Sequence, residues 1–183
     1  MPEREMRAHS LAEAYLYLLV TPCPLCGKGP LISGEAALLS SEGRLHIATI
    51  AAACRACGAA NSWQFQILPG KAQAGSDEIN ASDRPSQLID LSQWITLSRV
   101  ISEAASRSDD RIQARGFRIQ AWQCLDEALK FFEPGNAIPP GTAFFTPESK
   151  QRFRDHPEQF ERSRLLQLRD RLPNQSTTRR NGQ

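Results

Sequence analysis

The sequence lacks the long apolar runs and the one-sided charge that mark membrane proteins and binders of polyanions. No stretch approaches the ~20 apolar residues that a membrane span needs, so we expect no contact with a membrane. The formal net charge of the 183 residues is only +2, which by itself does not indicate nucleic acid as a partner. The first five residues carry both signs of charge, so we expect no secretory signal and a cytoplasmic location.

Motifs of catalysis are also missing from the sequence. It contains no glycine-rich phosphate loop, no nucleophile elbow and no pair of carboxylates at a telling spacing. The histidines, His9, His46 and His156, are scattered along the chain and do not group with cysteine or aspartate. We therefore expect that the protein is not an enzyme.

Cysteine is scarce but concentrated. Of five cysteines, four lie in two C-x-x-C-G segments, 23–27 and 54–58, with 27 residues between Cys26 and Cys54. Such a tight turn points two sulfurs at one ion, and the following glycine lets backbone amides turn toward the sulfurs. Tight pairs fit a metal site in a reducing compartment better than disulfides. The predicted ligands of one structural zinc ion are Cys23, Cys26, Cys54 and Cys57. The fifth, Cys124, is expected to be buried in a helix.

The two segments resemble the paired knuckles of the zinc-ribbon family, and the likeness covers about 50 residues. It implies a zinc ion in a small antiparallel sheet, but no particular partner, because ribbons occur in transcription factors, ribosomal proteins, nucleic-acid enzymes and adaptors. Four thiolates also fill the coordination shell and leave no position for a catalytic water. Rubredoxins share the double knuckle and bind iron, so iron is the alternative metal. The aromatic crowding that shields a rubredoxin iron is missing here.

The segments around the knuckles predict an α+β fold. Residues 1–20 form an N-terminal helical segment in this interpretation, in which Ser10 and Glu13 have the capping-box spacing. Residues 21–68 form a three-stranded antiparallel zinc ribbon. Its first two strands are separated by a turn at 40–43, and the period-2 alternation of Trp63, Phe65 and Ile67 predicts its last strand.

The second half of the chain predicts helices. Residues 69–84 are polar and glycine-rich, and are expected to be a linker or an exposed loop. Residues 85–172 are expected to be a helical domain built on a long antiparallel hairpin, with Pro85 in a first helical turn and Ser108 as the N-cap of the second long helix, followed by two acids in its first turn. Residues 173–183 are expected to be a disordered tail.

Arginines recur at helical spacing in this half. The candidate partner-binding residues are Arg107, Arg111, Arg115 and Arg118, which the spacing predicts to form one stripe on the second long helix. The stripe either contacts phosphates or an acidic partner, or is a solvated face paired with Glu103 and Asp110. Residues 147–183 hold nine Lys and Arg against five Asp and Glu, and the same two interpretations apply to them.

Together these features favour a non-catalytic zinc-binding adaptor that contacts another macromolecule, with a protein as the preferred partner. The alternative is a nucleic-acid-binding, transcription-related zinc-ribbon protein that uses the arginine stripe. A rubredoxin-like electron carrier ranks third. Salt-dependent binding separates the first two, and visible colour identifies the third, because ferric tetrathiolate absorbs visible light and zinc does not.

Overall fold

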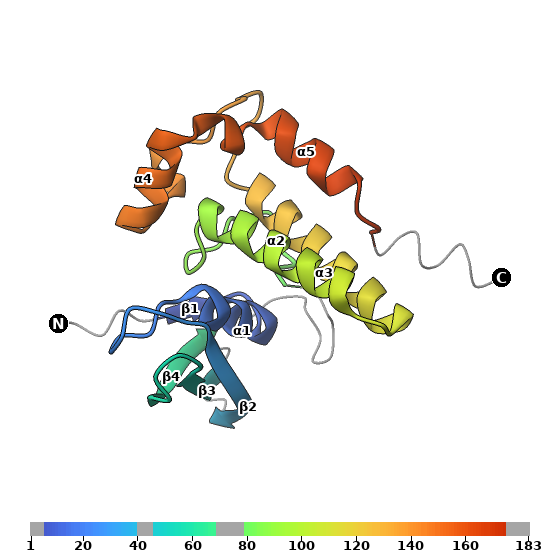
Figure 1. Ribbon diagram of the computed structural model, residues 1–183. Coiled ribbons are helices and arrows are strands. Elements are labelled where there is room, and N and C mark those ends of the chain that lie inside the picture. The colour runs from blue at the N-terminus through green and yellow to red at the C-terminus, as the bar shows by residue number, and fades with distance from the viewer. Residues whose placement is uncertain (1–5, 40–45, 69–78, 175–183) are drawn as a thin grey trace. The chain divides into compact units, whose positions relative to one another are not determined.

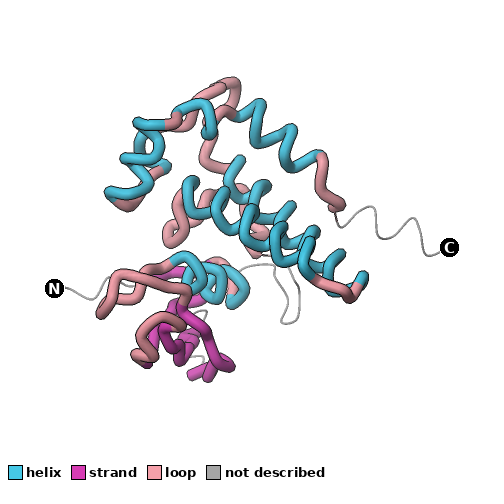
Figure 2. The backbone as a smooth tube through the Cα atoms, viewed as in Figure 1, coloured by secondary structure: helices cyan, strands magenta, loops and turns pink. Residues whose placement is uncertain are grey.

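A computed structural model of the chain describes residues 6–39, 46–68 and 79–174 (Figure 1). The chain divides into two compact units, residues 1–88 and residues 89–183. The strands of the described residues all lie in the first unit together with one helix, whereas the second unit contains only helices (Figure 2). An α+β class is therefore confirmed. None of the helices within the described ranges is long and apolar enough to cross a membrane.

The first unit contains a mixed sheet rather than the predicted three-stranded antiparallel ribbon. The strands are β1 (Met6–Ala8), β2 (Leu31–Leu39), β3 (His46–Cys54) and β4 (Ala60–Ile67), in the order β1-β4-β3-β2. β2 and β4 are antiparallel to β3, as expected, but β1 pairs in parallel with β4. The prediction was wrong because a three-residue strand shows no measurable alternation, and its pairing is distant in the sequence. The expected turn at 40–43 lies outside the described residues.

Helix α1 (Leu11–Val20) begins where the capping signal predicts. The Ser10 hydroxyl accepts a hydrogen bond from the Glu13 N–H at 3.1 Å. The reciprocal half of the box is displaced by one residue, because the Glu13 carboxylate accepts from the His9 N–H and lies 3.1 Å from His9 Nδ1. Glu13 is fully buried, so these bonds hold a carboxylate inside the unit rather than at its surface.

One face of the sheet packs against α1 to form the core of this unit. Leu18 is fully buried there together with Ile50 of β3 and Phe65 of β4. The Tyr17 ring meets Phe65 edge-on at a centroid distance of 6.0 Å, and Tyr15 accepts a hydrogen bond from the β2 backbone. The alternation predicted for β4 is confirmed, because Trp63, Phe65 and Ile67 all pack on this core.

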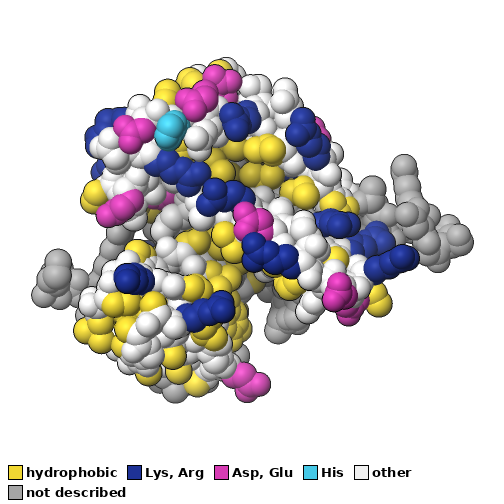
Figure 3. All heavy atoms as spheres, viewed as in Figure 1, with side chains coloured by type: hydrophobic (Ala, Val, Ile, Leu, Met, Phe, Trp, Pro, Cys, Tyr) yellow, Lys and Arg dark blue, Asp and Glu magenta, His cyan; other side chains and the backbone are white. Residues whose placement is uncertain are grey.

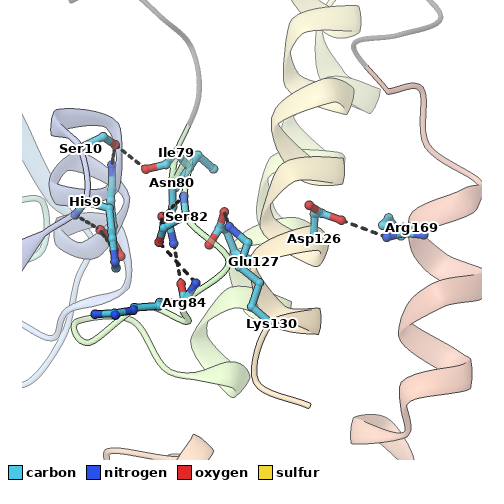
Figure 4. Close-up of polar contacts among 11 residues, drawn as sticks. His9, Ser10, Ile79, Asn80, Ser82, Arg84, Asp126, Glu127, Lys130 and Arg169 are labelled. Atoms are coloured by element: carbon cyan, nitrogen blue, oxygen red, sulfur yellow. Dashed lines mark hydrogen bonds and ion pairs between the residues drawn. The ribbon is translucent and has the colours of Figure 1, made fainter. Parts of the chain in front are cut away.

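Residues 79–88 belong to the first unit. The Ser10 hydroxyl donates to the Ile79 carbonyl at 2.6 Å (Figure 4), and Ile79 and Asn80 are buried. Leu88 packs against the core of this unit. Residues 69–78, most of the expected linker, lie outside the described residues.

The second unit is built on α2 (Leu91–Arg107) and α3 (Arg111–Leu129), joined by a short connection. The Ser98 hydroxyl donates to the Ala121 carbonyl at 2.9 Å, which ties the middle of one helix to the middle of the other and fits an antiparallel hairpin. The N-cap of α3 is Asp110, two residues after the predicted Ser108, because the Asp110 carboxylate accepts from the N–H groups of Ile112 and Gln113. The first helix begins later than Pro85, because the side chain of Asp90 and that of Gln93 form a capping box at Leu91.

Two short α-helices and two turns of 3-10 helix complete the second unit. They are η1 (Gly141–Ala143), α4 (Pro147–Asp155), η2 (Pro157–Phe160) and α5 (Arg162–Asp170). Phe144, Phe153 and Phe160 form an aromatic cluster, with the first two rings stacked at 4.5 Å between centroids. Arg169 of α5 pairs with Asp126 of α3 at 2.9 Å (Figure 4). Residues 175–183, most of the expected tail, lie outside the described residues.

Candidate metal centre

The two C-x-x-C-G knuckles adopt the same backbone geometry. In the first, the Gly27 N–H donates to the Cys23 carbonyl at 2.8 Å; in the second, the Gly58 N–H donates to the Cys54 carbonyl at 2.8 Å. Both glycines have positive φ, +67° at Gly27 and +74° at Gly58. Because side-chain-bearing residues avoid this region, glycine is what allows each turn to close after its second cysteine.

The sheet brings the two knuckles together. The first knuckle lies between α1 and β2, and the second begins at Cys54, the last residue of β3. Cys54 pairs with Leu31 at the start of β2, and the Arg55 N–H donates to the Pro30 carbonyl at 3.0 Å. The strand pairing of β2 with β3 therefore sets one turn directly against the other.

All four predicted ligands converge on one point. Their sulfurs lie within 4.8 Å of one another. The Cys23 and Cys57 sulfurs are 3.8 Å apart, and those of Cys26 and Cys54 are 3.7 Å apart. A tetrahedral zinc with Zn–S bonds of ~2.3 Å has sulfurs ~3.8 Å apart, so these separations fit the edges of such a site. They are far longer than the ~2.05 Å of a disulfide, and all four cysteines are free.

The electrostatics of the cysteine cluster also favour the binding of a cation. The backbone N–H groups of Cys26 and Leu25 donate toward the Cys23 sulfur and lower the pKa of that thiol to about 7. At Cys57 the N–H of Ala59 acts in the same direction, but the three neighbouring sulfurs and desolvation raise the pKa to about 12. Thiolates packed this closely repel one another, and a divalent ion at their centre removes that repulsion.

The donor set restricts the chemistry of the site. Cys23 and Cys54 are buried in the core of the first unit, whereas Cys57 is exposed at its surface. Four sulfurs complete a tetrahedral shell, so a bound ion has no open position at which to activate water or substrate. The knuckles also precede strands rather than helices, so no helix N-terminus is present to favour a reactive thiolate. The arrangement suits a structural ion.

The remaining predicted residues lie elsewhere. His46 is exposed at the start of β3 and does not belong to the cysteine cluster. The four arginines do not share one helix: Arg107 is the last residue of α2, 3.6 Å from Glu103, whereas Arg111, Arg115 and Arg118 lie on α3. The prediction of one stripe on a single helix was therefore wrong, because the spacing of the arginines gives no sign of the helix break at 108–110. All four side chains are exposed.

Sequence reasoning missed one feature of the sheet, its outer face, which lies opposite the face packed on α1. The alternation of Ile47, Thr49, Ala51 and Ala53 along β3 was a usable signal, since the residues between them are the buried ones. The partners of these residues on β2 and β4 are likewise uncharged: Ile32, Ala37, Ala60, Ser62, Gln64 and Gln66. These paired positions on β2, β3 and β4 carry no charge. The exposed Arg7 of β1 pairs with Gln66 at the edge of this face, and the exposed Glu35 lies in the irregular stretch of β2.

The chain matches no model of a known protein family, no curated protein and no solved structure. The case for a metal centre therefore depends on the four sulfurs and the two knuckles themselves.

Proposed function

We propose that the protein is a non-catalytic adaptor whose N-terminal unit is held together by one structural zinc ion and whose surfaces contact another protein. The assignment of a metal site rests on one observation: the four cysteine sulfurs lie within 4.8 Å of one another. A small sheet with one covering helix buries little apolar surface, and structural zinc contributes about 10–16 kcal/mol of binding free energy in peptides. The zinc is therefore assigned to folding and not to chemistry.

Elemental analysis tests the metal assignment. Protein purified under reducing conditions without chelator is expected to hold one zinc per chain and to be colourless. A stoichiometry near zero would contradict the metal site. A visible absorption band that appears on oxidation and bleaches on reduction would instead identify iron and favour the electron carrier.

The outer face of the sheet supports a protein as the partner. Ile32 is 50% exposed and Ile47 is 40% exposed on this face; Ile32 pairs with Ala53, and Ile47 pairs with Leu39 on β2 and with Gln66 on β4. Protein interfaces are poor in charge at their centres, whereas binding to nucleic acid needs cations that neutralise phosphates. The paired positions on β2, β3 and β4 meet the first requirement. Arg7 of the edge strand β1, which pairs with Gln66, places one exposed cation beside them, at the margin of this face and not at its centre.

A pull-down with the tagged full chain tests this face. Ala51→Arg places a cation at an exposed position in the middle of β3, and is expected to abolish the co-purification of proteins that bind this face. Ser163→Arg is the matched control, since Ser163 is exposed on α5. If both variants retain the same co-purifying proteins, the outer face is not the contact surface.

The alternative is a nucleic-acid binder, and the exposed arginines of α3 favour it. Arg111, Arg115 and Arg118 recur at helical spacing, but Asp110 precedes them and the net charge of the chain is only +2. We therefore expect negligible binding of oligonucleotides at physiological salt. Submicromolar binding would reverse this order of preference. In that case the double variant Arg111→Ala/Arg115→Ala should reduce the salt dependence of binding by about two phosphate contacts. The control double variant Arg162→Ala/Arg164→Ala on α5 should leave the salt dependence unchanged.

A further inference from the structure

Arg152 of α4 is held in a fixed position by neutral groups. Its Nη1 donates to the Thr96 hydroxyl oxygen of α2 at 2.9 Å, and its Nη2 donates to Gln159 Oε1 at 3.3 Å. Its guanidinium carbon lies 5.9 Å from the centroid of the Phe160 ring. The Thr96 hydroxyl itself donates to the Ser92 carbonyl, so its oxygen can accept from Arg152. The guanidinium is therefore immobilised, yet none of these partners carries a negative charge.

Arg169 provides a comparison within the same unit. Arg169 is half-buried like Arg152 and stacks over Trp122, but it pairs with Asp126 at 2.9 Å and with Asp170 at 3.2 Å. Within the part of the chain that the structure describes, Arg152 has no such carboxylate. A cation that is partly removed from water is costly unless a counter-charge offsets it. The counter-charge that Arg169 obtains from the protein is thus missing at Arg152.

A second cation faces the same place. Arg99 follows Thr96 by three residues on α2, so the two side chains share a helix face, and Arg99 is exposed. Burial and the nearby charge of Arg99 lower the pKa of Arg152. Figure 3 shows Lys and Arg side chains side by side on the surface of the helical unit over α2 and α4, with an acidic side chain next to them over α2. Glu103, one turn after Arg99 on α2, is paired with Arg107 at 3.6 Å. Two positive charges therefore converge where α2 and α4 meet.

We propose that Arg99 and Arg152 bind a phosphate-class dianion at the surface between α2 and α4. A guanidinium has more N–H donors than Thr96 and Gln159 use, and its planar fork matches oxyanions. A phosphate carries about −1.5 to −2 charge at pH 7, which offsets both arginines, whereas a carboxylate offsets only one. Neutral partners that fix Arg152 in advance reduce the entropy lost on binding.

The charges around Arg152 favour an anion beside Arg99 over one in the pocket along α4. Arg152 lines that surface pocket together with Arg154 and His156, but Glu148 and Asp155 line it as well, and no residue of α2 does. Their carboxylates would repel a dianion, whereas Arg99 would attract it. The site lies wholly within the second unit, so it goes beyond the proposed zinc-dependent function and does not depend on it.

Calorimetric titration of the full, zinc-loaded chain tests the proposal. The ligands are inorganic phosphate, a short phosphoserine peptide with neutral flanks, and acetate, all at constant ionic strength. Saturable binding of a phosphate compound, but not of acetate, is expected. Tighter binding of the peptide than of inorganic phosphate would identify a phosphorylated partner as the source, and equal binding would identify the free ion.

Three variants separate a built site from general attraction to a basic surface. Arg99→Gln changes an exposed side chain and is expected to weaken phosphate binding roughly tenfold or more, because it removes a charge-assisted contact. Arg152→Lys keeps the charge but loses the fork, and is expected to weaken binding as well. Arg164→Gln, which alters an exposed arginine of α5, should leave binding unchanged. Absence of saturable binding, equal weakening in Arg99→Gln and Arg164→Gln, or acetate binding as tight as that of phosphate would each overturn the proposal.

Discussion

At the scale of single residues, Cys26 and Cys124 form a matched pair for testing the metal centre. Both are free thiols, but Cys26 belongs to the cluster and Cys124 is buried in α3. Cys26→Ser should reduce the zinc content from one per chain to near zero and remove the sheet signal in circular dichroism, because a hydroxyl is a poor ligand for zinc. Cys124→Ala should keep one zinc per chain and lower the free energy of unfolding by about 1–2 kcal/mol.

The opposite results for these two variants would show that the metal is bound elsewhere or depends on further residues. If Cys26→Ser retains one zinc per chain, the four sulfurs do not form the site, whatever their separation. If Cys124→Ala loses zinc, the metal depends on the helical unit as well.

The ligands could be predicted from sequence because their geometry is local. The C-x-x-C-G spacing alone determines where two sulfurs of one turn point, and the glycine explains how the turn closes. Glu13 shows where local reasoning fails. Its spacing from Ser10 correctly predicted a cap, but whether its carboxylate bonds to Ser10 or to His9 depends on how the preceding residues enter the sheet as β1.

At the scale of elements, Asp90 does more than begin a helix. It is fully buried, and one carboxylate oxygen accepts from the Gln93 N–H at 2.9 Å. The other accepts from the N–H groups of Phe145 and Thr146, which ties the segment before α4 to the start of α2. Asp90→Ala should therefore lower the free energy of unfolding of the second unit by about 3–7 kcal/mol: the cap contributes about 1, and each of the two N–H groups left unbonded costs about 1–3.

Asp110 supplies the control for that measurement in denaturant melts. Its carboxylate caps α3 through the N–H groups of Ile112 and Gln113, two and three residues further on, and it is exposed. Asp110→Ala should cost only about 1 kcal/mol. Equal losses in the two variants would mean that the bonds from Asp90 to residues 145–146 contribute nothing measurable.

Gly116 is a position in α3 where a substitution is expected to raise the stability of the protein. It lies inside the helix and is exposed, and a Cβ added there would meet no atom within 4 Å. Because glycine costs about 0.5–1 kcal/mol relative to alanine in a helix interior, Gly116→Ala should raise the free energy of unfolding by that amount. A loss of stability in thermal or denaturant melts would show that this position needs the freedom of glycine.

Helices and strands could be predicted where the sequence shows a periodic apolar pattern or an N-cap residue. The strand containing Trp63 and Phe65 was expected correctly, and the start of α3 was expected two residues early, at Ser108 instead of Asp110. The start of α2 was misplaced because Leu88 continues the helical spacing of Leu91, although Leu88 packs in the first unit. Strand β1 was missed because its hydrogen bonds are made to β4, a pairing that local pattern cannot reveal.

At the scale of the whole molecule, the boundary between the units falls at 88/89. The polar composition of residues 69–84 had favoured a joint several residues earlier. Composition could not show that Ile79 is buried or that Ser10 donates to its carbonyl, because both depend on a contact with residues far away in the sequence. If each unit folds around its own core, loss of the metal should affect only the first.

The reactivity of the five cysteine thiols can test whether the two units unfold separately. Burial, followed by the charge of Glu127, raises the pKa of Cys124 far above its ordinary value, so this thiol is neutral at pH 8 and reacts only when the second unit opens. In native zinc-loaded protein, alkylation at pH 8 should modify none of the five thiols rapidly. After chelation, mass spectrometry should show four modified cysteines with Cys124 protected, while helical circular dichroism largely persists. Addition of denaturant should then make Cys124 reactive as well. Modification of Cys124 together with the other four on chelation alone would show that the two units unfold as one cooperative structure around the zinc.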